Sequence, residues 1–323
     1  MNRKRFLAAL AAILMSMTAP AMAQQAWPAR PVTLTVMYGA GGYIDLLARA
    51  FAQRLETALG QPVVIMNRPG AQGALALDLA RRQAPDGYNL TIVTGSSMAV
   101  LPHLMAVNFT IDDFAYAGAF AMPRYGVAVQ GKSPYKTMDQ LIAAAKRGPG
   151  VFMGSSSALN TLILADMNHR FGTHFEVVAY KSAPEVSNAL LSGQVAVIVS
   201  NPPDIVPYLK DGKMRLLASA SPARWPHTPE VPTLKELGFH SIDADSWVGL
   251  AAPKGTPKPV MARLEAALLD ICKNKEFRDV LETRGTDALC ANGADMDNYL
   301  RKRRVEWGEA IQRANLPREE APR

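Results

Sequence analysis

A turn that contains three glycines separates the first strand-like segment of the chain from the first helix-like segment. Residues 32–37 form the short apolar run of a strand, Gly39 to Gly42 form the turn, and a helical period begins at about Ile44. A helix that starts after such a turn leaves backbone N–H groups unpaired and directs the positive end of its dipole at one place. The sequence therefore predicts that this turn binds an anion.

A dinucleotide would be one such anion, but the turn lacks two features of dinucleotide sites. The third glycine of the fingerprint is missing, and the second strand-like segment ends at Asn67, where an acidic residue would hold a ribose. We therefore expect no nicotinamide cofactor and no other cofactor. The predicted anion is a carboxylate or an inorganic oxyanion.

Serines follow three later strand-like segments, which end near residues 93, 153 and 179. Hydroxyl and turn N–H groups at the ends of parallel strands converge on one edge of a sheet. Such donors hold a carboxylate, but without a general base beside them they do not readily transform a substrate. For each serine alone, a plain helix cap is the alternative. Taken together, the pattern favours binding at Ser96, Ser97, Ser155, Ser156, Ser157 and Ser182.

Ser156 also allows a second interpretation, that of a secreted hydrolase. Residues 154–158 approach the turn that carries a nucleophilic serine between a strand and a helix. A catalytic triad would need an acid and a histidine later in the chain. The candidates in the required order are Asp204 or Asp211 with His227 or His240. Neither histidine lies in a recognisable triad context, so the hydrolase is kept as the alternative.

Composition narrows the remaining function classes. The five histidines and two cysteines show no metal-ligand spacing, so we expect no metal site. Cys272 and Cys290 form a disulfide or remain buried thiols, and a single pair leaves both outcomes open. The net charge of +7 comes without a run of basic residues interleaved with aromatics, so no nucleic-acid partner is expected. The basic cluster at residues 301–304 is interpreted as a solvated helix face.

The first 23 residues have the layout of an export signal. Three basic residues at positions 3–5 precede an apolar stretch at residues 6–19, and residues 21–23 match the small-x-small cleavage pattern. Cleavage after Ala23 would leave 300 residues of the 323-residue chain as a soluble periplasmic protein.

Those 300 residues exceed what one hydrophobic core usually organises, so we expect two lobes. Strand-like and helix-like segments alternate from residue 32 onward, and the alternation starts again after a crossing near residues 121–127. A second crossing near residues 244–250 leads into a return strand and then into helices that pack back on the first lobe. The predicted lobes are 24–125 with 247–323 for lobe 1 and 126–246 for lobe 2.

Many short blocks of the sequence match one known family in order. They are residues 27–32, 41–42, 45–49, 60–64, 67–71, 84–88, 180–184, 193–195, 211–215, 229–233 and 247–250. Through these blocks the chain resembles the periplasmic solute-binding proteins of tripartite tricarboxylate transporters, the Bug family, over essentially its whole length after the signal.

The resemblance implies a two-lobe α/β periplasmic binding protein of the Venus-flytrap kind, type II-like, in which each lobe is a mainly parallel sheet flanked by helices. Such a protein is not an enzyme; it is a monomer that closes on a small organic acid and delivers it to a membrane permease. A receptor that serves a sensor kinase is the alternative. The implied ligand-binding positions are Tyr38, Gly39, Ala40, Gly41, Gly42, Tyr43, Ile44, Ser96, Ser97, Ser155, Ser156, Ser157, Asn160, Thr161, the run Tyr180 to Ala183 including Ser182, and Ser200, Asn201 and Pro202.

Several positions depart from the usual family pattern. Tyr43 and Ile44 stand in the first turn, and Ser200 stands where the family often has Asp. Loss of that acid disfavours an amino-acid ligand, because an ammonium group would need a charge partner. We expect Tyr43 to lie over the mouth of the cleft and, together with Tyr38, to favour a plain or aromatic carboxylate. Trp247 is expected to pack in the core or the hinge, with stacking on the ligand as the alternative.

Overall fold

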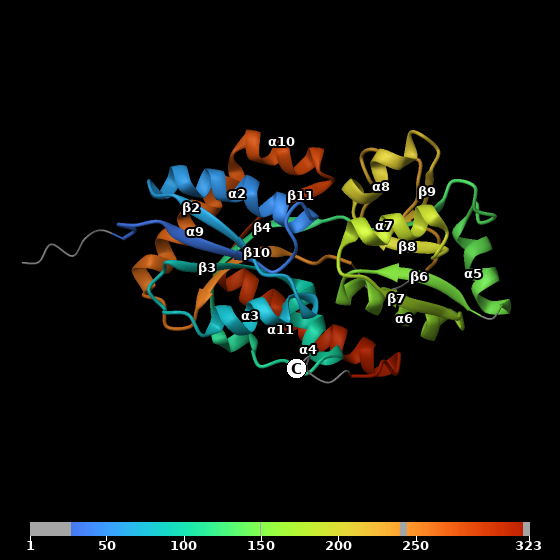
Figure 1. The fold of residues 1–323 in the computed structure, drawn as a ribbon, viewed down its shortest axis with the longest axis horizontal. Coiled ribbons are helices and arrows are strands. Elements are labelled where there is room, and N and C mark those ends of the chain that lie inside the picture. Colours follow the sequence, from blue (N-terminus) through green and yellow to red (C-terminus); the bar gives the residue numbers. More distant parts are fainter. Residues whose placement is uncertain (1–26, 149, 240–243, 319–323) are drawn as a thin grey trace, which may run out of the picture.

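The computed structural model describes residues 27–148, 150–239 and 244–318 (Figure 1). The predicted export signal and its cleavage site after Ala23 lie outside the described residues. Among the described residues, no helix is long and apolar enough to cross a membrane.

Two sheets form the framework of the molecule, and they lie side by side in Figure 1. The first has the strand order β11-β4-β10-β3-β1-β2 and the second has the order β7-β6-β8-β5-β9. The first sheet thus takes its strands from both ends of the chain, whereas the second uses only the middle. The bounds are β1 Val32–Val36, β2 Val63–Asn67, β3 Asn89–Thr94, β4 Phe114–Pro123, β5 Gly126–Gln130, β6 Val151–Ser155, β7 Phe175–Ala179, β8 Val197–Ser200, β9 Met214–Ser219, β10 Val248–Pro253 and β11 Thr286–Asn292.

Both sheets are mixed, but most strands of each run in one direction. In the first sheet β10 and β11 are antiparallel to the others, and in the second only β5 is. Strand β10 is the predicted return strand, and it lies in the centre of the first sheet between β3 and β4. The predicted architecture of two α/β units with mainly parallel strands is confirmed.

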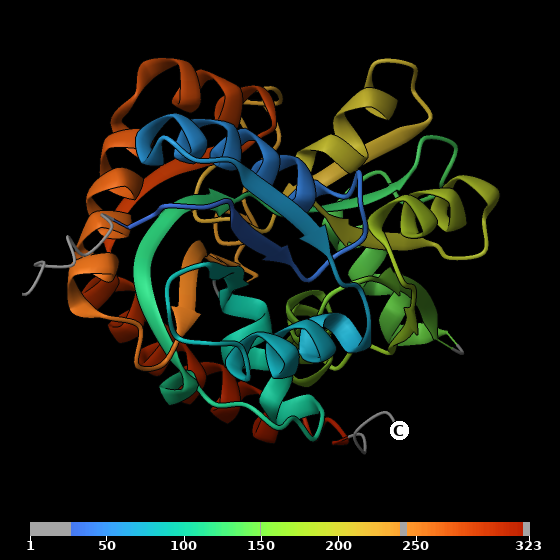
Figure 2. The ribbon, with the colours of Figure 1, turned by 60° about the vertical axis from the view of Figure 1, so that its left-hand side comes forward.

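The first sheet is covered on both faces because its strands are apolar on both sides. Helix α2 presents Leu47, Phe51 and Leu55 at four-residue spacing, all fully buried. Phe51 stacks on Phe120 of β4 with ring centroids 4.3 Å apart. Together with α2, helices α9 and α10 cover one face of the first sheet. Helices α3, α4 and α11 cover its other face (Figures 1 and 2). The bounds are α2 Tyr43–Leu59, α3 Ala74–Arg81, α4 Leu101–Leu104, α9 Lys258–Lys273, α10 Lys275–Thr283 and α11 Gly293–Arg313.

The second sheet is covered in the same way. Helices α7 and α8 pack on one face and α5 and α6 on the other. The core under α6 is continuous with the core under α11, so apolar packing joins the two units on that side. The bounds are α5 Met138–Arg147, α6 Ala158–Phe171, α7 Ala183–Ser192 and α8 Pro202–Leu209.

Helix α11 anchors the second crossing between the sheets. Trp247 stacks on Tyr299 of α11 with ring centroids 4.2 Å apart, and the Tyr299 hydroxyl accepts a hydrogen bond from the Trp247 amide. Arg303 forms an ion pair with Asp245, and only 16% of its side chain is exposed. Trp247 therefore packs against α11 at this crossing and does not line the cavity, which agrees with the packing interpretation and not with stacking on the ligand. The basic cluster at 301–304 is not wholly a solvated face, because Arg303 points inward to hold this crossing.

The sequence analysis did not predict β11, which forms the edge of the first sheet beside β4. Gly118 of β4 has φ +138° and contacts the Ala291 carbonyl so closely that a side chain there would collide with β11. A disulfide between Cys272 of α9 and Cys290 ties this strand to the helix layer. Of the two alternatives for the cysteines, the structure has the disulfide.

Candidate functional site

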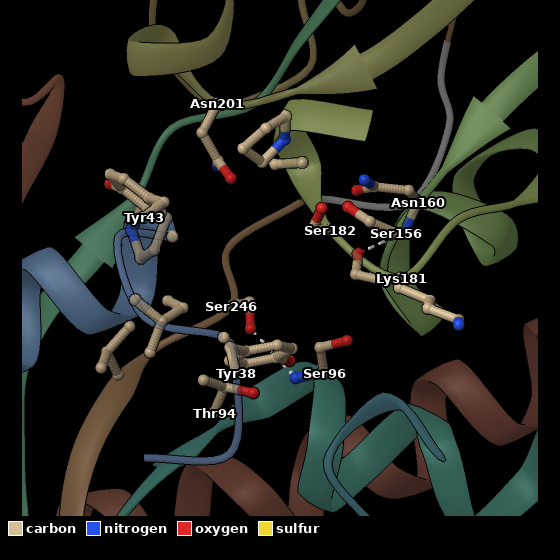
Figure 3. Close-up of a pocket in the computed structure, with 18 of the residues that line it drawn as sticks. Tyr38, Tyr43, Thr94, Ser96, Ser156, Asn160, Lys181, Ser182, Asn201 and Ser246 are labelled. Carbon is tan, nitrogen blue, oxygen red and sulfur yellow. Dashed lines mark hydrogen bonds between the residues drawn. The ribbon is translucent and has the colours of Figure 1, made fainter. Parts of the chain in front are cut away.

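A cavity of about 170 Å³ lies between the two sheets and takes its walls from both (Figure 3). Sites for drug-sized ligands measure about 300–1,000 Å³, so this cavity suits a compact molecule. Its lining residues are Tyr38, Gly39, Ala40, Gly42, Tyr43, Ile44, Thr94, Ser96, Pro123, Tyr125, Ser156, Ser157, Asn160, Lys181, Ser182, Ala183, Pro184, Asn201, Ser246 and Val248.

The glycine turn between β1 and α2 is held in place by Asp45. One oxygen of this buried carboxylate accepts hydrogen bonds from the Gly41 amide and from Arg49 Nε, both at 2.8 Å. Its other oxygen accepts a bond from Asn67 Nδ2 at 2.8 Å. Burial alone would raise the pKa of Asp45, but these hydrogen bonds outweigh it and hold the pKa below its ordinary value. Gly41, which has φ +78°, is therefore committed to the turn itself.

Tyr43 does not lie over the mouth of the cleft as the sequence analysis expected. It is 7% exposed, and its hydroxyl forms a hydrogen bond with Thr286 Oγ1 of β11. Burial raises the pKa of the Tyr43 phenol, against the effect of that hydrogen bond. The expectation failed because β11 was not predicted, and β11 supplies the partner that draws the hydroxyl inward. The Tyr43 residue still forms part of the cavity wall.

Ser96 connects the two sides of the cavity. Its amide donates to Ser246 Oγ at 3.0 Å, and its own hydroxyl oxygen accepts a bond from the Leu159 amide of α6 at 3.2 Å. Ser97 faces its own turn instead, where its hydroxyl bonds to Thr94. Figure 3 shows Ser96, Thr94, Ser246 and Tyr38 grouped on one side of the cavity. The hydrogen bond from the Leu159 amide to Ser96 therefore connects the start of α6 to these four residues.

The turn before α6 separates serines with different roles. Ser157 is the N-cap of α6 and accepts a bond from the Asn160 amide at 3.3 Å. The Ser155 hydroxyl donates to the Ser157 carbonyl at 3.0 Å and lies 3.1 Å from Thr161 Oγ1. Ser155 and Thr161 thus stabilise the turn from behind, whereas Ser156 and Ser157 line the cavity.

The turn before α7 contributes Ser182 and an exposed cation. The Ser182 hydroxyl donates to Glu185 at 3.1 Å, which fixes the start of α7. Tyr180 packs on the core of the second sheet and does not line the cavity. Lys181 lies exposed at the edge of the cavity (Figure 3).

The turn before α8 places an acid one helical turn behind Ser200. The Ser200 hydroxyl donates to Asp204 at 2.6 Å and is turned away from the cavity. Burial raises the pKa of the Asp204 carboxyl, although the bond from Ser200 opposes this. Asn201 does line the cavity, and its side-chain amide donates to the Arg124 carbonyl at 2.6 Å.

Four helices begin at the cavity, namely α2, α6, α7 and α8. The start of a helix carries partial positive charge and unpaired amides. Three of these helices carry their own acid in the first turn, at Asp45, Glu185 and Asp204, whereas α6 has none. Among the described residues, the cavity lining includes Lys181 and no Asp or Glu. The electrostatics of the cavity therefore favour an anion, with the largest uncompensated contribution at the start of α6.

The structure brings most of the predicted positions together and excludes some. Those that do not line the cavity are Gly41, Ser97, Ser155, Thr161, Tyr180, Ser200 and Pro202. Lining residues missed by the sequence analysis are Thr94, Pro123, Tyr125, Pro184, Ser246 and Val248. Four of the missed residues lie at the two predicted crossings. Their position could have identified them, because segments that cross between two lobes form the floor of the cleft between those lobes.

In the part of the chain that the structure describes, no catalytic triad forms at Ser156. The lining residues include no histidine; His227 lies elsewhere, and His240 falls outside the described residues. Asp204 is bonded to Ser200, and Asp211 pairs with a lysine. Ser156 therefore has no base within the described lining to take its proton.

Two α/β units that are joined by two crossings, with a cavity lined from both, define a two-lobe solute-binding protein. The family model described as tripartite tricarboxylate transporter family receptor matches residues 47–316, so the chain belongs to this family.

Similar proteins agree with this assignment. A UPF0065 protein of Bordetella bronchiseptica is 32% identical over 95% of this chain and 92% of its own length. BugT of Bordetella pertussis is 28% identical over 96% of this chain and 98% of its own. The solved structure of the R. palustris protein Rpa4515 with adipate has a TM-score of 0.85 and 27% identity, covering 90% of this chain and 99% of that one.

Proposed function

We propose that this chain is a periplasmic receptor that captures a small organic carboxylate in the cavity between its lobes. The observation that carries the proposal is the meeting of four helix starts at a cavity whose described lining contains a lysine and no acid. The related structure with adipate supports a carboxylate in particular. The ligand contacts are assigned to the lining residues, with the start of α6 and the amides of Tyr43 and Ile44 as the principal donors.

In this proposal, residues 24–125 with 247–323 move against residues 126–246, and the ligand favours the closed arrangement. A ligand shifts such an equilibrium only by binding one state more tightly, which requires donors from both lobes. The mature protein acts as a monomer after cleavage behind Ala23 and hands its ligand to the membrane permease of a tripartite tricarboxylate transporter. Family membership supports this delivery step.

A thermal-shift screen of the purified protein tests the capture step. Linear and aromatic mono-, di- and tricarboxylates are compared with neutral sugars and amino acids, and we expect at least one acid to raise Tm in a concentration-dependent way. An unchanged melting curve across the whole acid panel would contradict the proposal. An uptake assay in the host then tests delivery: deletion of the gene should abolish uptake of that acid, whereas intact uptake would point to the sensor-kinase alternative.

A further inference from the structure

Asn160 carries a hydrogen-bond acceptor that no described group satisfies. It is 4% exposed, it lines the cavity, and its Oδ1 atom is buried without a donor among the described residues. Buried side-chain oxygens usually have a partner, so an exception calls for an explanation. Figure 3 shows the amide end of Asn160 on the same side of the cavity as Ser156 and Ser182.

The orientation of this amide is fixed by its other atom. Asn160 Nδ2 donates to the Val199 carbonyl of β8 at 2.8 Å, and the Asn160 backbone amide donates to Ser157 Oγ at 3.3 Å. A flip of the side chain would place Oδ1 against the Val199 carbonyl and lose that bond. Oδ1 is therefore held as an acceptor in a residue of the cavity wall, where a molecule bound in the cavity can supply the donor that it lacks.

The chemistry of the surroundings limits what that donor is. An ammonium group would need an acidic partner, yet the described lining has Lys181 and no Asp or Glu. Asn160 also sits in the first turn of α6, where the helix favours negative charge close by. A neutral hydroxyl next to a carboxylate satisfies both conditions, because the carboxylate meets the helix start while the hydroxyl donates to Oδ1.

Building on the proposed function, we infer that Asn160 selects a hydroxylated carboxylate over the same acid without the hydroxyl. When the deoxy acid is bound, Oδ1 stays buried without a donor, and this costs affinity. We expect the hydroxy acid to bind about tenfold more tightly or better.

Calorimetric titration of matched acid pairs on the purified protein tests this inference. The pairs are succinate with 2-hydroxysuccinate, propionate with 2-hydroxypropionate, and benzoate with 4-hydroxybenzoate. In the tightest-binding pair, the dissociation constant of the deoxy acid should exceed that of the hydroxy acid by about tenfold or more. Equal affinities within a bound pair would overturn the inference while leaving the carboxylate receptor intact. No binding by any of the six acids would overturn the inference for these pairs, whereas the receptor itself is tested by the wider acid panel of the thermal-shift screen.

A variant assigns the preference to Asn160. Asn160→Leu keeps a similar volume and removes Oδ1, so the ratio should fall to about one, mainly through weaker binding of the hydroxy acid. Asn168→Leu is the matched control, since Asn168 lies on the same helix and its amide is bonded to Phe175 and Thr173 outside the cavity. The control should keep the wild-type ratio. If Asn160→Leu keeps the wild-type ratio of the two dissociation constants, the inference is also overturned. If this variant does not fold, the ratio measured for the wild-type protein decides the question.

Discussion

At the scale of single residues, the hydrogen bonds of each serine decide whether it faces the cavity or its own turn. Ser97 follows β3 and Ser155 is the last residue of β6, but each bonds to groups of the adjoining turn. Ser96 and Ser156 stand beside them and line the cavity. Position after a strand therefore predicts the turn correctly, but neighbouring serines in one turn point in different directions, and sequence alone does not separate them.

Substitution of Ser156 should weaken binding of the captured acid. Its hydroxyl faces the cavity beside the start of α6, so Ser156→Ala should raise the dissociation constant about three- to tenfold with little change in Tm. Ser155→Ala is the control, because it removes bonds within the turn and should mainly lower Tm. Calorimetry and melting curves on both variants separate the two effects. Weaker binding in Ser155→Ala together with a lower Tm in Ser156→Ala would contradict these assignments.

Asp45 should stabilise the fold in a pH-dependent way. Its pKa is lowered in the folded protein, so its contribution is present above the unfolded pKa of about 4 and is lost as pH falls through the lower folded pKa. Asp45→Asn should cost about 1–3 kcal/mol of unfolding free energy at pH 7, and the difference from wild type should narrow below about pH 4. Urea unfolding at several pH values measures this.

The exposed pair Lys275–Asp279 supplies the control for that experiment, with 87% and 55% of the two side chains accessible. Asp279→Asn should leave the free energy of unfolding unchanged at each of these pH values, because solvent screens an exposed pair. A difference for Asp45→Asn that stays constant down to pH 3 would show that its charge does not hold the glycine turn.

At the scale of elements, the edge strand β11 of the first sheet is difficult to predict from the sequence. Residues of β11 read Thr-Asp-Ala-Leu-Cys-Ala-Asn, which lacks the alternation of a typical strand and has Thr286 as its one β-branched residue. Their conformation comes from pairing with β4, where Gly118 allows the close approach, and from the disulfide at Cys290. By contrast, β1 and α2 were predictable, because the apolar run of the strand, the glycine turn and the helical spacing of apolar residues all indicate the same strand–turn–helix unit. The orientation of Tyr43 was missed for the same reason as β11.

Reduction of the disulfide should loosen this edge. Cys272 and Cys290 are separated by 18 residues, and closing a loop of that size contributes about 3 kcal/mol by the chain-entropy estimate. Dithiothreitol should lower Tm by roughly 5–10 °C. The double variant Cys272→Ala with Cys290→Ala should have the Tm of the dithiothreitol-treated wild type, and dithiothreitol should not change the Tm of this variant. Equal Tm for the oxidised and reduced wild type would contradict a stabilising role.

At the scale of the whole molecule, two kinds of contact hold the lobes together. Apolar packing of α6 against α11 joins them on one side, and the bond from the Leu159 amide to Ser96 Oγ joins them at the cavity. The polar contact lies at the cavity wall, where the proposed ligand would bind. In the closure that we propose, a ligand bound in the cavity would bias this polar contact.

Removal of the polar contact should favour the open arrangement. Ser96→Ala leaves the Leu159 amide without its acceptor, so the ligand-free variant should show a larger radius of gyration in X-ray scattering and a weaker apparent affinity. Ser97→Ala, whose hydroxyl bonds only to Thr94 in its own turn, should behave as wild type in both measurements. An identical radius of gyration for all three proteins, with and without ligand, would rule out closure around this contact.

The most direct test of the central claim compares a bound acid with its uncharged amide by calorimetric titration. Capture by helix starts and Lys181 requires the negative charge, so the acid should bind with one-to-one stoichiometry, and its primary amide should bind at least about a hundredfold more weakly. Equal binding of acid and amide, or no binding of any acid, would contradict the account of this cavity as a carboxylate site.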